Sequence, residues 1–380
     1  MHKLPRLVAI LIAAVFLNPA PGSAETFLVI SDTHFTKEAR DDDAMQEAVA
    51  QAAREADAVL LLGDSTNNAY PEEHNLVLQW TREIRQRSGA EVYILPGNHD
   101  YRPLFGPDEF TAWYRSCGWG RAFSRDIATA GYAVMTENGT CLIMLDTNDF
   151  DQTRSALPYG GIAQSTLDWV RDVLASLPDG TPVLVCGHHA VLPAERDELT
   201  PGASALGRIL RTYGAGVYLC GHDHGFATVE QEGLRQITVG QPQAYPGWAG
   251  IVELDQGVFR WHTLRIYDEQ SPAFIRLKGD AYSLGRRMAE GTLDPTPYSG
   301  DRDAVEWFAT AYMLFAGGEM TPEKIARLLA DENCRKWRQV ETRTVVKDWI
   351  LGLLENPPED VKRLDLPASQ KRSAGTPDPF

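Results

Sequence analysis

The first part of the chain alternates short apolar runs with segments whose apolar residues recur at helical spacing. The apolar runs at 26–30, 57–62 and 92–95 predict buried strands, because each is continuous and ends at turn-forming residues. Between them, residues 44–55 and 74–87 carry apolar side chains at intervals of three and four, which predicts two helices. This strand-helix-strand order predicts parallel strands in a layered α/β domain.

The region that follows predicts more strands and helices, up to about residue 266. Asn138-Gly139, between the apolar runs 132–136 and 141–145, predicts a β-hairpin. Further elements are expected as helices at 163–177 and 205–213 and as strands at 182–186, 216–220, 234–239, 250–254 and 258–264. The last three strands are expected to form an antiparallel meander.

Changes of pattern divide the chain into four parts. Residues 1–24 carry a basic start, an apolar run at 7–17 and a small-residue site, which predicts a signal peptide cleaved after Ala24. Residues 25–271 are expected to form the α/β domain, and 272–365 a C-terminal helical domain, because strand patterns stop there. Residues 366–380, rich in Pro, Ser and Lys, are expected to be disordered.

The N-terminal pattern also predicts where the protein resides. Its apolar run is too short to span a bilayer, so we expect no stable membrane span after cleavage and a secreted or periplasmic protein. A retained signal anchor or a buried N-terminal element are the alternatives.

The amino-acid composition indicates which kinds of molecule the protein can bind. Of 380 residues, 43% are hydrophobic and 23% charged, which is ordinary for a globular protein, but the formal net charge is −16. Because an acidic surface repels nucleic-acid backbone, we expect no nucleic-acid scaffold. A small phosphorylated substrate is compatible with this charge, since bound metal ions reverse the local field. The oligomeric state does not follow from the sequence.

Polar clusters follow five of the predicted strands. They are Asp32-x-His34, Gly63-Asp64, Gly97-Asn98-His99-Asp100, Gly187-His188-His189 and Gly221-His222-x-His224. Ligands of layered α/β sheets gather at the carboxyl ends of strands, so we expect one shared site. Residues two apart in an extended chain point to the same side, so each of the Asp-x-His and His-x-His pairs is expected to reach one ion.

The residue types predict metal chemistry. Imidazole, carboxylate and amide donors without a thiolate favour ions such as Mn, Fe or Zn over a closed structural zinc site. The donors are too many for one ion and enough for two, which together form a clamp for phosphoryl transfer. Asp64, alone at its strand end, is the candidate bridge, and His99 is a candidate general acid because imidazole titrates near neutral pH.

In order and number these motifs resemble those of the calcineurin-like metallophosphoesterase superfamily, over roughly residues 26–266. The resemblance implies a four-layer α/β/β/α sandwich, here with an added helical domain. It further implies a first metal held by Asp32, His34, Asp64 and His224, and a second held by Asp64, Asn98, His188 and His222. His99 would assist the leaving group, with Asp100 as its orienting partner. The resemblance favours His188 over the adjacent His189 as the ligand.

Residues that differ from the motifs of particular branches indicate which branch of the superfamily the sequence resembles. Ser65-Thr66-Asn67-Asn68 lacks the arginine of protein Ser/Thr phosphatases, and Asn67 replaces the tyrosine of purple acid phosphatases. What remains looks similar to a bacterial branch that includes phosphodiesterases. We therefore expect a dinuclear enzyme that hydrolyses a phosphodiester by attack of a metal-bridging hydroxide. A broad phosphomonoesterase and a non-catalytic metal-binding interaction protein are the alternatives.

Overall fold

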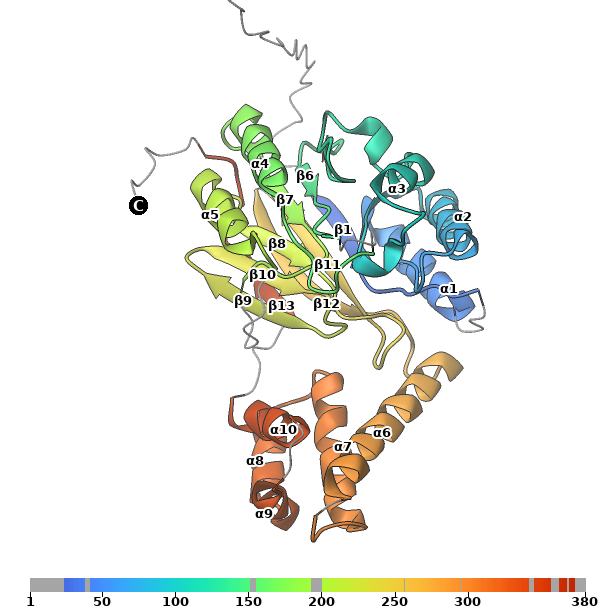
Figure 1. Ribbon diagram of the computed structural model, residues 1–380, viewed down its shortest axis with the longest axis vertical. Coiled ribbons are helices and arrows are strands. Elements are labelled where there is room, and N and C mark those ends of the chain that lie inside the picture. Colours follow the sequence, from blue (N-terminus) through green and yellow to red (C-terminus); the bar gives the residue numbers. More distant parts are fainter. Residues whose placement is uncertain are drawn as a thin grey trace, which may run out of the picture.

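The computed structural model describes residues 24–37, 42–150, 155–192, 200–255, 257–294, 296–341, 345–356, 362–367 and 369–372. The expected signal peptide, up to residue 23, and residues 373–380 of the expected tail lie outside them. Two β-sheets lie between two layers of helices, and a further group of helices forms a separate body (Figure 1). No helix in this described part is long and apolar enough to cross a membrane.

The first sheet contains the predicted parallel strands. Its strand order is β13-β12-β11-β1-β2-β3. β1 (Glu25–Ile30), β2 (Ala58–Leu62) and β3 (Glu91–Leu95) run parallel, joined through α1 (Asp42–Ala52) and α2 (Pro71–Ser88). A short helix, α3 (Pro107–Trp113), follows on the same side (Figure 1). The predicted strand-helix order of this half is confirmed.

The second sheet has the order β4-β5-β6-β7-β8-β10-β9. Its strands are β4 (Ser124–Arg125), β5 (Tyr132–Met135), β6 (Cys141–Met144), β7 (Val183–Cys186), β8 (Val217–Cys220), β9 (Ala227–Gln231) and β10 (Leu234–Thr238). The predicted hairpin is present as β5 and β6, with Met135 opposite Cys141. α4 (Gln164–Ser176) and α5 (Ala203–Tyr213) cover its outer face (Figure 1).

Three apolar layers hold the sandwich together. One lies between the sheets and includes Phe27, Leu60, Leu184 and Trp261, all buried. The other two lie between each sheet and its helices. The central strands of each sheet are therefore covered on both faces, which is why β2, β7 and β8 are continuous apolar runs. The four-layer α/β/β/α fold is confirmed.

The predicted meander is wrong. β10 lies in the second sheet, parallel to β8, whereas β11 (Trp248–Asp255) and β12 (Val258–Arg265) form a hairpin in the first sheet beside β1. The chain therefore changes sheets between β10 and β11. Inner faces of both sheets pack into the same apolar layer, so hydrophobicity does not reveal to which sheet a strand belongs.

The helical body consists of α6 (Pro272–Leu293), α7 (Arg302–Ala316), α8 (Pro322–Ala330), α9 (Glu332–Gln339) and α10 (Val346–Glu355). It has its own core, in which the rings of Phe308 and Trp337 lie 4.9 Å apart. Thr321 caps α8 and Pro322 occupies its first position, where the fixed φ of proline suits a helix and its missing N–H is not needed. The start of α6 packs on the sandwich through Phe274 and Leu277.

The expected C-terminal boundaries at 365 and 366 are wrong. β13 (Arg363–Asp365) pairs with β12, so the chain returns to the first sheet after the helical body. Beyond it, Val183 N donates to the carbonyl of Ser369, and Lys371 N donates to the carbonyl of Thr181. Leu364 and Leu366 are buried in the inter-sheet layer, which gives this polar-looking segment its anchor.

Candidate metal centre

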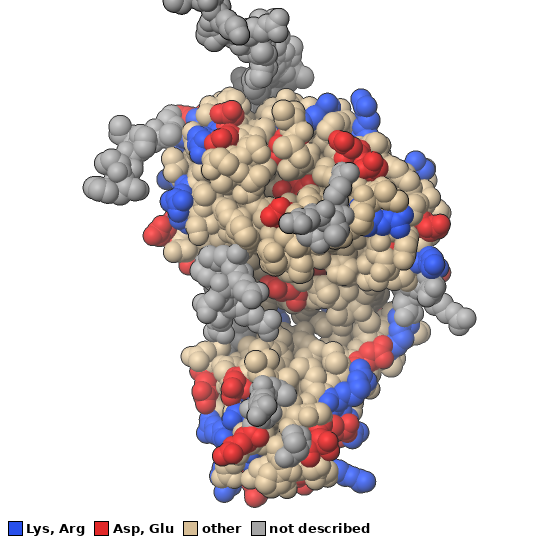
Figure 2. Space-filling model, in the orientation of Figure 1, with Lys and Arg blue, Asp and Glu red and all other residues tan. Residues whose placement is uncertain are grey.

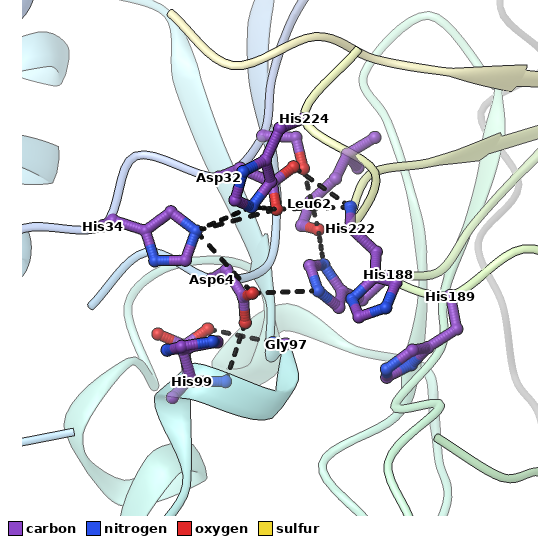
Figure 3. A network of polar contacts seen from close by, with 12 residues as sticks. Asp32, His34, Leu62, Asp64, Gly97, His99, His188, His189, His222 and His224 are labelled. Carbon is purple, nitrogen blue, oxygen red and sulfur yellow. Dashed lines mark hydrogen bonds and ion pairs between the residues drawn. The ribbon is translucent and has the colours of Figure 1, made fainter. Parts of the chain in front are cut away.

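The five polar clusters of the sequence meet at one end of the sandwich, where β1, β2, β3, β7 and β8 end (Figure 3). Main-chain hydrogen bonds tie their loops together. Asp32 N donates to Gly63 O over 3.1 Å, and His34 N donates to Asp64 O over 2.9 Å. Gly63 has φ +88°, and a Cβ there would lie 2.6 Å from Gly97 N and 2.7 Å from His188 Nδ1. Only glycine fits between these loops.

Side chains are brought together by tight turns rather than by extended strands. Five of the expected ligands have left-handed backbone conformations: Asp32 (φ 56°), His34 (φ 42°), Asp64 (φ 47°), His222 (φ 75°) and His224 (φ 59°). The reason given above for each i, i+2 pair, a shared face of an extended chain, is therefore wrong. Non-glycine residues seldom adopt such angles, and they concentrate at functional sites.

A first cluster combines two imidazoles with two carboxylates. Nε2 of His34 and Nε2 of His224 lie 3.1 Å apart. Nε2 of His224 lies 3.5 Å from Oδ1 of Asp32, and Nε2 of His34 lies 3.8 Å from Oδ2 of Asp64. One donor atom of each residue lies within 4.8 Å of all the others. Four donors thus surround one small volume (Figure 3).

A second cluster is marked by buried atoms that lack partners. Nε2 of His188, Nδ1 of His222 and Oδ1 of Asn98 are buried without a hydrogen bond. His188 and His222 belong, with His189, to one group of possible metal ligands, and Nε2 of His189 is unpartnered as well. Native structures pair nearly all buried polar atoms, so unpartnered nitrogens within one such group indicate a missing partner that accepts lone pairs. A metal ion has this property. The donor set of both clusters, imidazole with carboxylate or amide oxygen, fits transition-metal ions.

Asp64 joins the two clusters. Its Oδ1 accepts a hydrogen bond from His99 N over 2.8 Å, which fixes the carboxylate. Its Oδ2 lies 3.2 Å from Nε2 of His188 in the second cluster and faces His34 in the first. A single oxygen therefore borders both donor sets, as the expected bridging role requires.

The adjacent histidines His188 and His189 have different surroundings. His188 Nδ1 bonds to the carbonyl of Leu62 over 2.8 Å, which directs Nε2 towards Asp64. His189 Nδ1 bonds to Thr147 Oγ1 over 2.8 Å, and its ring lies 4.7 Å from that of His222. Both belong to a group that could hold an ion. The contact with Asp64 favours His188 as the ligand.

Electrostatics favour neutral imidazoles at most positions. Burial lowers the pKa of His34 and of His222 to about 4 each, and lowers the pKa of His224. Neutral imidazole is the form that binds metal. His188 differs: burial opposes its charge, but Asp64 raises its pKa to about 10. Burial likewise opposes ionisation of Asp64, yet His188 holds the pKa of this carboxyl below its usual range.

His99 and Asp100 have different roles from each other. Nδ1 of His99 bonds to the carbonyl of Asn67 over 2.8 Å, and its ring lies 4.9 Å from that of His34. The buried Asp100 carboxylate instead accepts hydrogen bonds from the amides of Gly97, Ser65 and Thr66. The expected contact of Asp100 with the His99 ring is therefore wrong. Asp100 holds the loop, and the Asn67 carbonyl orients the ring.

The sequence could not reveal two of these partners. The carbonyls of Leu62 and Asn67 orient the rings of His188 and His99, and any residue type supplies a carbonyl. Thr147, which holds His189, is a side chain that spacing could have suggested, because it follows the predicted strand at 141–145.

This combination of a four-layer sandwich with two donor clusters joined by one carboxylate defines the metallophosphoesterase class of fold and site. A family model for calcineurin-like phosphoesterases matches residues 25–226. The chain belongs to the calcineurin-like phosphoesterase family. The predicted superfamily is confirmed, whereas the bacterial phosphodiesterase branch stays a prediction.

Individual relatives cover part of the chain. Tartrate-resistant acid phosphatase type 5 of Mus musculus is 30% identical over 192 residues, which is 47% of this chain and 58% of that protein. The Homo sapiens protein of the same name is 29% identical over 192 residues, again 47% of this chain and 58% of that protein. The match thus spans little more than half of these relatives. A dimetal phosphatase from Danio rerio has a similar fold, with a TM-score of 0.50, 18% identity and coverage of 64% of this chain and 97% of that one.

Proposed function

We propose that this protein is a phosphoric ester hydrolase that uses two transition-metal ions, with Mn, Fe and Zn as the candidates. The observation that carries the proposal is the position of Asp64 Oδ2 between two sets of imidazole donors. The first ion would be held by Asp32, His34, Asp64 and His224, and the second by Asp64, Asn98, His188 and His222. When bound, such a pair supplies Lewis acidity and an activated water for phosphoryl transfer.

His99 is proposed to handle a proton. A carbonyl oxygen only accepts hydrogen bonds, so the contact with Asn67 places a proton on Nδ1 of His99. Nε2 can then receive a proton when the ring is neutral, and it donates one to the leaving group only when both ring nitrogens are protonated. The ring lies beside His34 of the first cluster, so the leaving group would depart on this side of the site.

We further propose a phosphodiester as the substrate. In the described part of the chain, no arginine belongs to the two clusters or forms an ion pair with them, so neither cluster carries a fixed bidentate clamp of the kind that suits a monoester dianion. Phosphomonoester hydrolysis is the second candidate, and the name of the acid phosphatase relatives favours it. A non-catalytic metal-binding role is the least supported, because every expected ligand is present.

Turnover of two chromogenic substrates separates these candidates. We expect kcat/KM for bis-p-nitrophenyl phosphate to exceed that for p-nitrophenyl phosphate in the metal-loaded protein. The reverse order would replace the diesterase proposal with the monoesterase. Turnover of neither substrate by protein that contains two ions would favour the non-catalytic role.

Export is proposed from the N-terminal pattern alone. A basic start, an apolar run at 7–17 and a small-residue site support cleavage after Ala24 and a secreted or periplasmic location. Cleavage there would leave β1, which begins at Glu25, intact. N-terminal sequencing of protein recovered from the periplasm or medium should begin at Glu25. Recovery of the whole chain from the cytoplasm, with Met1 retained, would contradict export.

The distribution of charged residues on the surface is compatible with a small substrate. Over the sandwich, Lys and Arg are scattered among Asp and Glu on the face shown in Figure 2, without a continuous basic surface there. Together with the net charge of −16, this supports our proposal that nucleic acid is not the scaffold on which the protein acts.

A further inference from the structure

Two cations lie over one tyrosine ring beside the metal centre. Nζ of Lys37 is 5.5 Å from the centroid of the Tyr70 ring, and the guanidinium carbon of Arg102 is 5.0 Å from it. Tyr70 is 42% exposed, so this group, called the Tyr70 cluster below, is open to solvent. Among the described residues, neither cation forms an ion pair with a carboxylate, although the chain is strongly acidic.

The same loops that carry the site also carry the Tyr70 cluster. Lys37 follows His34 by three positions, Arg102 follows His99 by three, and Tyr70 follows Asn67 by three. Three residues span at most about 11 Å, so each member lies close to a site residue.

Hydrogen bonds fix these loops against one another. Phe35 N donates to Ser65 O over 2.9 Å, and Asn67 N donates to Phe35 O over 3.0 Å. Thr66 N donates to the Asp100 carboxylate over 2.8 Å. Arg102 and Phe105 exchange two further main-chain hydrogen bonds. The main chain that carries the Tyr70 cluster is therefore held in place relative to His99.

Within the described ranges, no carboxylate is paired with Lys37 or Arg102 of the Tyr70 cluster. Nε of Arg102 is buried and has no hydrogen-bond partner. The carboxylate of Glu73, on the adjoining helix, is used by the amides of Asn68 and Tyr70. The aromatic ring stabilises each cation through its π face, but two positive charges at one ring repel each other. An anion with several oxygens would pair with both cations and remove this repulsion.

We propose that Lys37, Tyr70 and Arg102 form a second anion subsite, which binds a phosphate group carried by the leaving group of the substrate. This inference rests on the proposed function, because His99 marks the leaving-group side. The substrate class is thus a phosphate ester whose leaving group bears a second phosphate. In this hydrolysis water would supply the oxygen that bonds to phosphorus, and the bond between phosphorus and the ester oxygen would break. The ester oxygen would leave with a proton, and the second phosphate would not be transferred.

The test compares two substrates that differ in one group. One is a phenyl ester of phosphate or of methyl phosphate, whichever the enzyme turns over, and the other carries an additional phosphate on C4 of the phenyl ring. We expect kcat/KM to favour the phosphorylated ester, and the double variant Lys37→Gln/Arg102→Gln to reduce this preference by about tenfold or more. Turnover of the unsubstituted ester should change little. Arg208→Gln, which alters an exposed arginine on α5, is the matched control.

A binding measurement tests the subsite even if the protein turns over neither ester. Calorimetry of metal-loaded protein should show that the double variant weakens 1,4-phenylene bisphosphonate but not phenylphosphonate. An unchanged preference and unchanged bisphosphonate affinity would overturn the subsite while leaving the proposed function intact. Absence of all turnover with two ions bound would overturn the proposed function, and the calorimetric comparison would still decide the subsite.

Discussion

Nε2 of His34 lies 3.1 Å from Nε2 of His224, although 190 positions separate the two residues in sequence. Two imidazoles that bind one ion at about 2.0–2.1 Å place their nitrogens about 3–3.4 Å apart. Burial keeps both rings neutral by lowering their pKa values. The fold therefore sets these nitrogens at the separation that shared ligation requires.

Replacing the carboxylate of Asp64 should prevent the protein from holding two metal ions. Asp64→Asn leaves one neutral oxygen where two donor sets meet, so we expect the metal content to fall to one ion or fewer. Hydrolysis should fall at least about a thousandfold, because the ions supply several kcal/mol of transition-state stabilisation. Asp223→Asn is the matched control, since Asp223 lies between His222 and His224 in sequence but is exposed. Equal metal contents in the two variants would contradict the bridge.

Neighbouring residues of one motif should separate metal binding from proton transfer. Asn98→Ala removes a buried donor atom and should lower both metal content and activity. His99→Ala should keep the metal and lower kcat by about 10²–10⁴, the usual contribution of a general acid or base. Elemental analysis beside steady-state kinetics measures both. Loss of metal from the His99 variant would show that His99 is a ligand.

The choice between the adjacent histidines can be made with matched substitutions. His188→Gln should lower metal content, because Nε2 of His188 faces Asp64, whereas His189→Gln should keep it. Near-ultraviolet circular dichroism checks that both variants fold. Metal loss from the His189 variant with retention in the His188 variant would reverse the assignment.

The C-terminal segment is expected to stabilise the sandwich. Ending the chain after Lys362 removes β13 and exposes the sites of Leu364 and Leu366. The free energy of unfolding should fall by about 1.5–3 kcal/mol for each buried leucine. Ending the chain after Arg372 is the control, because it keeps these contacts. Denaturant midpoints measure the difference, and equal midpoints would show that the segment contributes nothing.

Sequence patterns predicted the local elements well and the long-range pairing less well. Helices such as α2 and α5 and the β5–β6 hairpin follow from spacing and turn chemistry, which act over a few residues. The sheet to which β10 belongs depends on packing against β8, which apolar content alone does not specify. β13 was missed because one buried leucine between charged residues gives no strand signal.

The site could be predicted in its residue types but not in its geometry. Histidines and carboxylates at strand ends indicated a shared metal site, since few other chemistries use such a set. The left-handed turns at Asp32 and His34 could not be foreseen, because both residue types adopt extended conformations more easily. The role of Asp100 was also misjudged, because its main-chain partners at Ser65 and Thr66 are distant in sequence.

If Asp64 joins two donor clusters as proposed, one chain holds two metal ions around it. Elemental analysis of the purified full-length protein, after dialysis against metal-free buffer, tests it most directly. We expect about two transition-metal ions per chain. Zero ions or one ion per chain, in protein that is folded by circular dichroism and was offered Mn, Fe and Zn, would contradict it.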